Sequence, residues 1–224
     1  MTFVAIRGAA RRVFSPIGLE LVDDFLATPT SPSAAMPLGP ITALLDVDDG
    51  AGNFIPTDAR ATITSHAVLT FPGIGRTPRP AIASPITFRV RIESPQYRPL
   101  YRATVDGITF VAPPWNDDEP ASLVPTFGRA VLLPAFNYQF PSYTPVLRGE
   151  VVDTAGEPVP DALVIESTTG ARALTDERGA FALALRWVPP GNATIDASDR
   201  FGHTGSISVV LPADLAHGQL IAIS

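Results

Sequence analysis

The chain has no cysteine and no lysine, and each absence narrows what the protein can be. Without cysteine, no disulfide holds the fold, no thiolate can act as a nucleophile, and zinc would depend on three scattered histidines and on carboxylates. All 16 basic residues are arginine, and 22 acidic residues bring the net charge to −6. We therefore expect no basic surface and no nucleic-acid partner.

Long apolar runs and helical periodicity are also missing. No uncharged apolar run approaches the roughly 20 residues of a membrane-spanning helix, so we expect no membrane span. Arg7, Arg11 and Arg12 follow only a few apolar residues, which reverses the order of a secretory leader. These features predict synthesis in the cytoplasm without a signal peptide. Apolar residues at helical spacing nowhere persist beyond about 12 residues without proline or glycine.

Strand patterning dominates instead. Runs rich in β-branched residues and bounded by turn-forming residues occupy 41–47, 59–71, 86–93, 103–111 and 129–136. Within 86–93, apolar and polar residues alternate strictly, which predicts a strand with one buried and one solvated face. Hydrophobic residues make up 46% of the 224 positions, enough to build sizeable cores. The predicted fold class is all-β.

Prolines divide the chain into two parts, since 19 of the 24 precede residue 146. Proline breaks strands and fixes loops, so we expect residues 1–145 to form an irregular β-sandwich with an N-terminal arm and proline-rich loops. A second, more regular sandwich is expected over 146–224. The segment that joins them is rich in aromatic residues, and we expect four of these to pack between the two domains: Phe136, Tyr138, Phe140 and Tyr143.

The second part shows about seven short strands separated by turns, the pattern of a Greek-key sandwich. Its stretches GEVVDTAGEPVPDALV, ALTDERGAFAL and PPGNATIDA resemble the carboxypeptidase regulatory-like domain, a transthyretin-like sandwich, over about residues 146–212. The matching positions are Gly149, Val151, Asp153, Gly156, Pro158, Val159, Ala162, Val164, Thr175, Asp176, Gly179, Phe181, Leu183 and Gly191. The resemblance implies a module appended to proteins of many functions, usually without catalysis. If residues 1–145 are a diverged copy of the same architecture, the chain holds two tandem sandwiches of transthyretin-like or immunoglobulin-like type.

An acidic stretch at 46–58 offers oxygen ligands of the kind that calcium prefers, from Asp46, Asp48, Asp49, Asn53 and Asp58. Their order differs from that of an EF-hand loop, because two aspartates are adjacent and no glutamate stands at the twelfth position. Asp-Gly also forms hairpin turns readily. We therefore favour a plain turn over a calcium site.

The histidines suggest no catalytic site either. His66, His203 and His217 share no ligand spacing. Asp199, His203 and Ser206 lie close in sequence, as in a nucleophilic triad, but their stretch has the pattern of a hairpin between two strands. We predict no catalytic residue, no metal and no cofactor, and we interpret the chain as a non-enzymatic protein. An enzyme of a transthyretin-like family remains the third alternative.

The organisation resembles that of accessory structural proteins of phage tails and phage-derived contractile injection systems, such as baseplate, collar or decoration proteins. That resemblance implies structural partners, symmetric multicopy or homo-oligomeric assembly, and a final place in a virion or injection particle. The N-terminal arm, with Phe3, Arg7, Arg11 and Arg12, is the candidate docking segment, because an extended arm can add to a neighbour's sheet edge. The alternative is a surface or secreted adhesion or carbohydrate-binding module, in which Trp115 would stack on a sugar.

Overall fold

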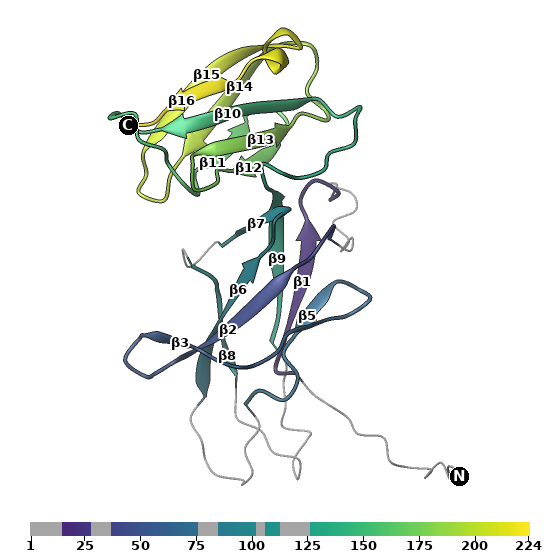
Figure 1. Ribbon diagram of the computed structural model, residues 1–224, viewed down its shortest axis with the longest axis vertical. Helices are drawn as coiled ribbons and strands as arrows, with labels where there is room; N and C mark the ends of the chain where they lie inside the picture. Colours follow the sequence, from purple (N-terminus) through teal and green to yellow (C-terminus); the bar gives the residue numbers. More distant parts are fainter. Residues whose placement is uncertain (1–14, 28–36, 76–84, 102–105, 113–125) are drawn as a thin grey trace, which may run out of the picture.

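The protein is described by a computed structural model that places residues 15–27, 37–75, 85–101, 106–112 and 126–224. Figure 1 shows two β-structured bodies stacked end to end along the long axis. The strands of the first are β1 (Ile17–Asp23), β2 (Thr42–Asp48), β3 (Phe54–Pro56), β4 (Thr62–Ile63), β5 (Val68–Thr70), β6 (Ile86–Glu93), β7 (Tyr97–Leu100), β8 (Ile108–Ala112) and β9 (Thr126–Pro134). Those of the second are β10 (Val146–Val152), β11 (Leu163–Glu166), β12 (Arg172–Leu174), β13 (Ala180–Ala184), β14 (Gly191–Ser198), β15 (Thr204–Leu211) and β16 (Gln219–Ala222).

The first body is a sandwich of two sheets with strand orders β4-β5-β1-β9-β7 and β3-β2-β6-β8. Both sheets contribute alternate apolar side chains to one core, because successive residues of a strand point to opposite faces. Its fully or almost fully buried members include Leu21, Leu45, Leu69, Phe71, Val90 and Leu132. In the five-stranded sheet the edge strands β4 and β7 are short, and the long strands β1 and β9 lie between them.

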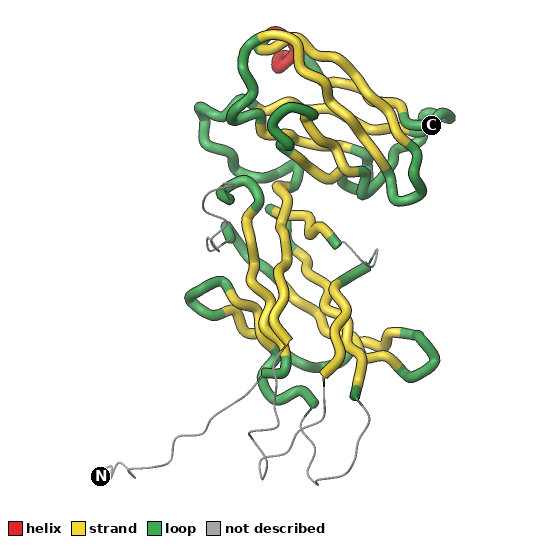
Figure 2. The backbone as a smooth tube through the Cα atoms, turned by 180° about the vertical axis from the view of Figure 1, so that it is seen from behind, coloured by secondary structure: helices red, strands yellow, loops and turns green. Residues whose placement is uncertain are grey.

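The second body is a smaller sandwich with strand orders β13-β10-β16 and β12-β11-β14-β15. Its core is separate from the first and includes Leu147, Val164, Phe181, Ile195, Val209 and Ile221. Figure 2 shows strands throughout both bodies and one short helix at the far end of the second, the 3-10 helix η2 (Ala213–Ala216). No helix within the described ranges is long and apolar enough to cross a membrane.

The prediction of two tandem all-β sandwiches is confirmed, and most strands lie where their patterns placed them. In β6 the predicted apolar face is buried, since Phe88, Val90 and Ile92 all face the core. One expected strand is wrong: residues 59–71 form two short strands, β4 and β5, with a turn between them. Ala67 adopts a φ of 57° there, which a continuous strand cannot contain. The proposed boundary near residue 145 lies between Tyr138 of the first core and Leu147 of the second.

Candidate functional site

The candidate site is the joint between the two sandwiches, and it begins with the turn that follows β1. This strand ends at Asp23, and residues 24–26 form the turn. One carboxylate oxygen of Asp23, Oδ1, accepts the backbone N–H groups of Phe25 at 2.9 Å and Leu26 at 3.1 Å. An aspartate at this place commonly closes a turn on its own backbone. The sequence therefore fixes the local shape of the joint.

The other oxygen of Asp23 ties this turn to the first core. Oδ2 accepts the hydroxyl of Tyr97 at 2.6 Å and that of Tyr138 at 3.0 Å. The Tyr97 hydroxyl in turn accepts the Leu38 N–H at 2.8 Å. Burial raises the pKa of both tyrosines, and the adjacent Asp23 carboxylate raises it further, so both remain protonated donors. With an exposed fraction of 1%, Asp23 thus has four donors in place of water.

The next residues of the turn face the second sandwich. Arg172, at the start of β12, donates from Nη2 to Oδ1 of Asp24 at 2.6 Å and from Nε to Oδ2 at 3.1 Å. Arg186, which follows β13, places its guanidinium 4.3 Å from the centroid of the Phe25 ring. It also donates to the Ala27 carbonyl at 3.3 Å. Asp23 therefore binds side chains of the first sandwich, while the next two residues, Asp24 and Phe25, contact arginines of the second.

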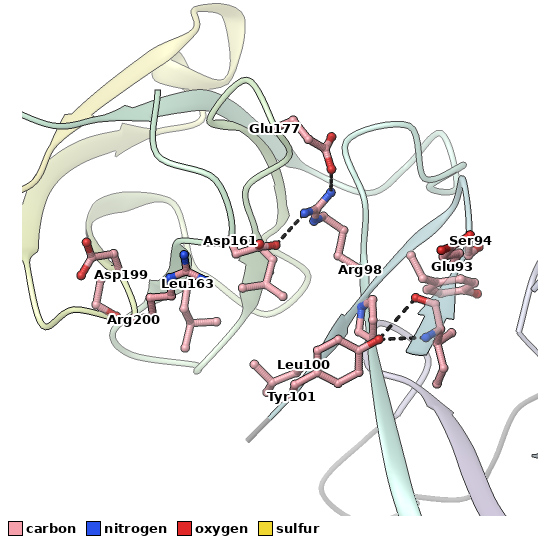
Figure 3. Close-up of a pocket in the computed structure, with 15 residues that line it drawn as sticks. Glu93, Ser94, Arg98, Leu100, Tyr101, Asp161, Leu163, Glu177, Asp199 and Arg200 are labelled. Atoms are coloured by element: carbon pink, nitrogen blue, oxygen red, sulfur yellow. Dashed lines mark hydrogen bonds and ion pairs between the residues drawn. The ribbon is translucent and has the colours of Figure 1, made fainter. Parts of the chain in front are cut away.

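On another side of the joint, Arg98 of β7 reaches between two loops of the second sandwich (Figure 3). Its Nη2 lies 2.6 Å from Oδ1 of Asp161, and its Nη1 lies 2.7 Å from Oε1 of Glu177. The hydrogen bond from Arg98 lowers the pKa of Glu177. Both acidic partners are exposed, so each pair contributes at most about 1 kcal/mol. The planar guanidinium nevertheless fixes the directions of both loops.

These residues border a cleft of about 730 Å³ between the sandwiches (Figure 3). Its walls come from residues 92–94 and 97–101 of the first sandwich, and from Asp161, Leu163, Leu174, Glu177 and residues 198–200 of the second. Its wall also contains Tyr101, whose hydroxyl accepts the Ile92 N–H at 2.9 Å. Arg98 is satisfied by its two carboxylate partners. Among the described residues, no group of three His, Cys, Asp or Glu side chains is placed to hold a metal ion. Three charged side chains of the cleft, Arg98, Asp161 and Glu177, connect the two sandwiches.

A second groove of about 320 Å³ lies beside the turn after β1 and runs along Asp24, Arg172 and Trp187. Trp187 is 71% exposed, and the Arg186 guanidinium lies 5.8 Å from its ring centroid. An exposed indole ring beside hydrogen-bonding groups has the chemistry of a sugar-stacking platform. Sequence reasoning placed that role on Trp115, which lies outside the described residues.

The acidic stretch at 46–58 forms a hairpin of β2 and β3, with the connecting turn at 49–53. Oδ1 of Asp48 accepts the N–H groups of Gly50 at 2.8 Å and Gly52 at 3.1 Å. Asp49 uses its own carboxylate in the same way, with the N–H groups of Ala51 and Asn53 and the Asn53 side-chain amide. Asp58 is exposed beyond the turn. Asp48 and Asp49 thus close the loop on its own backbone, and the preference for a plain turn over a calcium site stays a prediction.

Asp46 lies outside that turn. Its contacts show that the polar face of β6, which we expected to be solvated, is partly buried. Asp46 is fully buried in β2, where Arg89 and Arg91 each donate two hydrogen bonds to its carboxylate at 2.8–3.0 Å. The hydrogen bond from Arg91 lowers the pKa of Asp46. The polar face of the strand pair therefore carries an ordered ion-pair cluster, because a buried carboxylate needs close cationic partners.

The four aromatic residues expected between the domains have different positions. Tyr138 is buried in the first core, and Phe140 packs partly buried against that core. Phe136 lies at the junction, with the Arg148 guanidinium 4.8 Å from its ring centroid. Tyr143 is 85% exposed, so the expectation that it packs between the domains is wrong. Arginine side chains make the side-chain hydrogen bonds across the joint instead.

The remaining interface candidates, Phe3, Arg7, Arg11 and Arg12, lie outside the described residues. Asp199 and His203 do form a pair, with Oδ2 2.7 Å from Nδ1, but they lie in the hairpin between β14 and β15. Ser206 pairs with Asp196 instead. The hairpin prediction is thus confirmed.

Sequence reasoning missed the residues that hold the joint: Asp23, Asp24, Arg98, Arg172 and Arg186. Asp23 and Asp24 are adjacent turn-forming residues, and this pair is the one local signal that could have indicated the turn. Nothing near the arginines signalled their partners, because Arg172 lies 148 positions from Asp24. Such contacts depend on how two domains meet.

No protein-family model matches the chain, and no curated protein matches it. Similar solved structures include the Bacillus anthracis TIE protein, the shaft pilin SpaA of Lactobacillus rhamnosus GG in an E269A form, and a streptococcal ancillary pilin. Each is 11% identical, with TM-scores of 0.29, 0.28 and 0.26. The matches cover 94%, 92% and 92% of this chain, and 33%, 95% and 67% of those chains. The chain thus spans about a third of the TIE protein, and these TM-scores are too low to place it in a family.

Proposed function

We propose that the chain is a non-catalytic structural protein, a two-domain building unit held in one orientation within a larger assembly. The observation that carries this proposal is the set of arginine contacts across the joint. Arg172 and Arg186 hold the turn after β1, and Arg98 holds two loops on another side. Contacts on separate sides oppose rotation more strongly than one contact can. A building unit needs such a fixed angle to repeat the same geometry in every copy.

The finer proposal is an accessory component of a phage tail or phage-derived contractile injection particle. It is supported by the tandem sandwiches, the acidic composition and the high proline content of residues 1–145, because proline lowers the conformational entropy that is lost on docking. Other structural proteins would be its partners, and the particle its final location. The resemblance of residues 146–212 to a carboxypeptidase regulatory-like domain fits this use of sandwich modules as scaffolds.

Small-angle X-ray scattering tests the fixed orientation. The parent chain should give one elongated shape, whereas the triple variant Arg98→Gln, Arg172→Gln, Arg186→Gln should give a broader distribution of interdomain distances. Arg129→Gln is the matched control, because Arg129 pairs with Glu20 within the first sandwich. Identical scattering from the parent and the triple variant would overturn the proposed role of these contacts.

Assembly is tested separately. Size-exclusion chromatography with light scattering, followed by negative-stain imaging, should show rings, stacks or association with tail proteins. A strict monomer that binds glycans in an array would contradict the assembly proposal and favour the second candidate.

That second candidate is a carbohydrate-binding or adhesion module, and the exposed Trp187 beside the 320 Å³ groove favours it. In this case Trp187→Ala should abolish glycan binding. Phe201→Ala is the control, because Phe201 is equally exposed but belongs to the β14–β15 hairpin. Binding that survives Trp187→Ala would exclude this groove as the sugar site.

A further inference from the structure

In both sandwiches the first strand lies beside the last strand and runs parallel to it (Figure 1). β1 pairs with β9 over seven positions, from Ile17 opposite Thr126 to Asp23 opposite Leu132. β10 pairs with β16 over four positions, starting with Gly149 opposite Gln219. The same arrangement therefore occurs twice along the long axis.

Parallel pairing decides how a pulling force reaches the hydrogen bonds. The chain enters the first strand at one end and leaves the last strand at the opposite end. Tension along the chain thus drives the two neighbours in opposite directions along their own axes. The evenly spaced hydrogen bonds of a parallel ladder then share the load together. An antiparallel pair pulled from one end would open its bonds one after another.

We infer that the chain carries tension from one sandwich to the other, as a force-bearing link between other parts of an assembly. This inference rests on the proposed structural role, and it adds a mechanical task to it. The two sandwiches lie in series, so a force that passes through one passes through the other. Each would oppose that force with its parallel ladder.

Side chains reinforce the first ladder. Glu20 and Arg129 are directly opposite each other in the β1–β9 register, and their side chains form an ion pair at 2.9 Å. Near the start of the same pair, the ring of Phe127 lies against Gly18, where a side chain would meet it at 2.9 Å. Sliding β1 along β9 would break the ion pair and displace the ring. Both contacts therefore oppose shear.

In the second sandwich, close approach of the backbones reinforces the ladder. A side chain at Gly149 would meet the Gln219 carbonyl oxygen and, at 2.8 Å, the Phe181 ring. Beyond the last register pair, the Ile223 N–H donates to the Val152 carbonyl at 2.9 Å. This ladder is shorter than that of the first sandwich, so we expect the second sandwich to yield at the lower force.

Single-molecule force spectroscopy on the full chain tests the inference, and the absence of cysteine allows handles at chosen positions. The shear variant carries Tyr143→Cys and Ser224→Cys, which lie just before β10 and just after β16. The matched peeling variant carries Tyr143→Cys and Gly218→Cys, which lie before the starts of these two parallel strands. Tyr143 and Ser224 are exposed, and a side chain at Gly218 meets nothing within 4 Å.

We expect the shear variant to rupture at a force at least twofold higher than the peeling variant at the same pulling speed. Both should lengthen by about 25 nm, since each released residue adds about 3.5 Å. Matching circular dichroism and melting curves would establish that both variants are folded like the parent. Equal forces, or a higher force on peeling, would overturn the inference. A flexible joint in the scattering experiment would instead remove the fixed-orientation proposal and leave this result intact.

Discussion

Arg172 of the second sandwich donates hydrogen bonds to both carboxylate oxygens of Asp24 in the first, with the shortest distance at 2.6 Å. Both side chains are partly buried, at 28% and 19% exposure. The neighbouring Asp23 points into its own core. A single turn therefore transmits the position of one sandwich to the other.

A double-mutant cycle on this pair should show coupling. We expect Asp24→Asn and Arg172→Gln, alone and together, to reveal an interaction of about 1 kcal/mol in the free energy of unfolding, measured with urea. The control cycle is Glu20→Gln with Arg129→Gln, a more exposed pair whose coupling should be smaller and should vanish at high salt. If the effects of Asp24→Asn and Arg172→Gln were additive, this contact would contribute nothing to the free energy of unfolding.

Alkaline pH should destabilise the first sandwich. Burial raises the pKa of Tyr97, Tyr101 and Tyr138 above the ordinary value of 10.0. The unfolded chain then releases these protons at a lower pH than the folded chain. The stability that these protonated tyrosines contribute is complete below about pH 10, and it is lost as the pH rises through their raised pKa values in the folded chain. We expect the urea midpoint to fall above about pH 10, with phenolate absorbance appearing as the chain unfolds.

Substitutions separate these tyrosines from the exposed one. Tyr138→Phe should reduce the alkaline loss of stability, whereas Tyr143→Phe should leave it unchanged. Phenolate absorbance from all four tyrosines in a chain that remains folded by circular dichroism would contradict the burial argument.

Gly149 should be intolerant of any side chain. Its Cα approaches the Gln219 carbonyl and the Phe181 ring so closely that an added methyl group must displace backbone. We expect Gly149→Ala to lower the free energy of unfolding of the second sandwich by about 2 kcal/mol or more. Gly218→Ala, where the space is open, should change it by less than about 0.5 kcal/mol. Similar effects of the two substitutions would rule out close packing between β10 and β16.

Asp46 should matter for stability and not for calcium. Asp46→Asn leaves Arg89 and Arg91 without their buried anionic partner and should cost about 3 kcal/mol. Asp48→Asn, in the exposed turn, should cost at most about 1 kcal/mol. The parent chain should melt at the same temperature with and without millimolar calcium. A calcium-dependent rise in the melting temperature that Asp48→Asn removes would contradict this expectation and indicate a metal site.

Local patterning predicted much of the fold. Alternation located β6 and nearly every strand of the second sandwich, because burial on one face imposes a period of two on the sequence. Proline and glycine located the turns. The break within residues 59–71 could not be predicted, because Ala67 has a positive φ there and alanine rarely adopts one.

Much of the site could not be predicted in this way. Asp46 looked like a member of an acidic turn until its register placed it opposite Arg89 on β6. Tyr143 looked like its aromatic neighbours, yet among them only Tyr138 has both a buried acceptor for its hydroxyl, Asp23, and a place in the first core. These outcomes depend on pairing between distant segments, which composition and spacing do not encode.

The cross-joint cations are all guanidinium groups, in a chain that has no lysine. A guanidinium stays charged at every physiological pH, and enzymes that acetylate lysine amines find no substrate in these side chains. Lysine acetylation and deprotonation near neutral pH therefore cannot neutralise the cationic half of this joint. Protonation of the carboxylates at low pH or competition from dissolved ions would weaken these contacts instead.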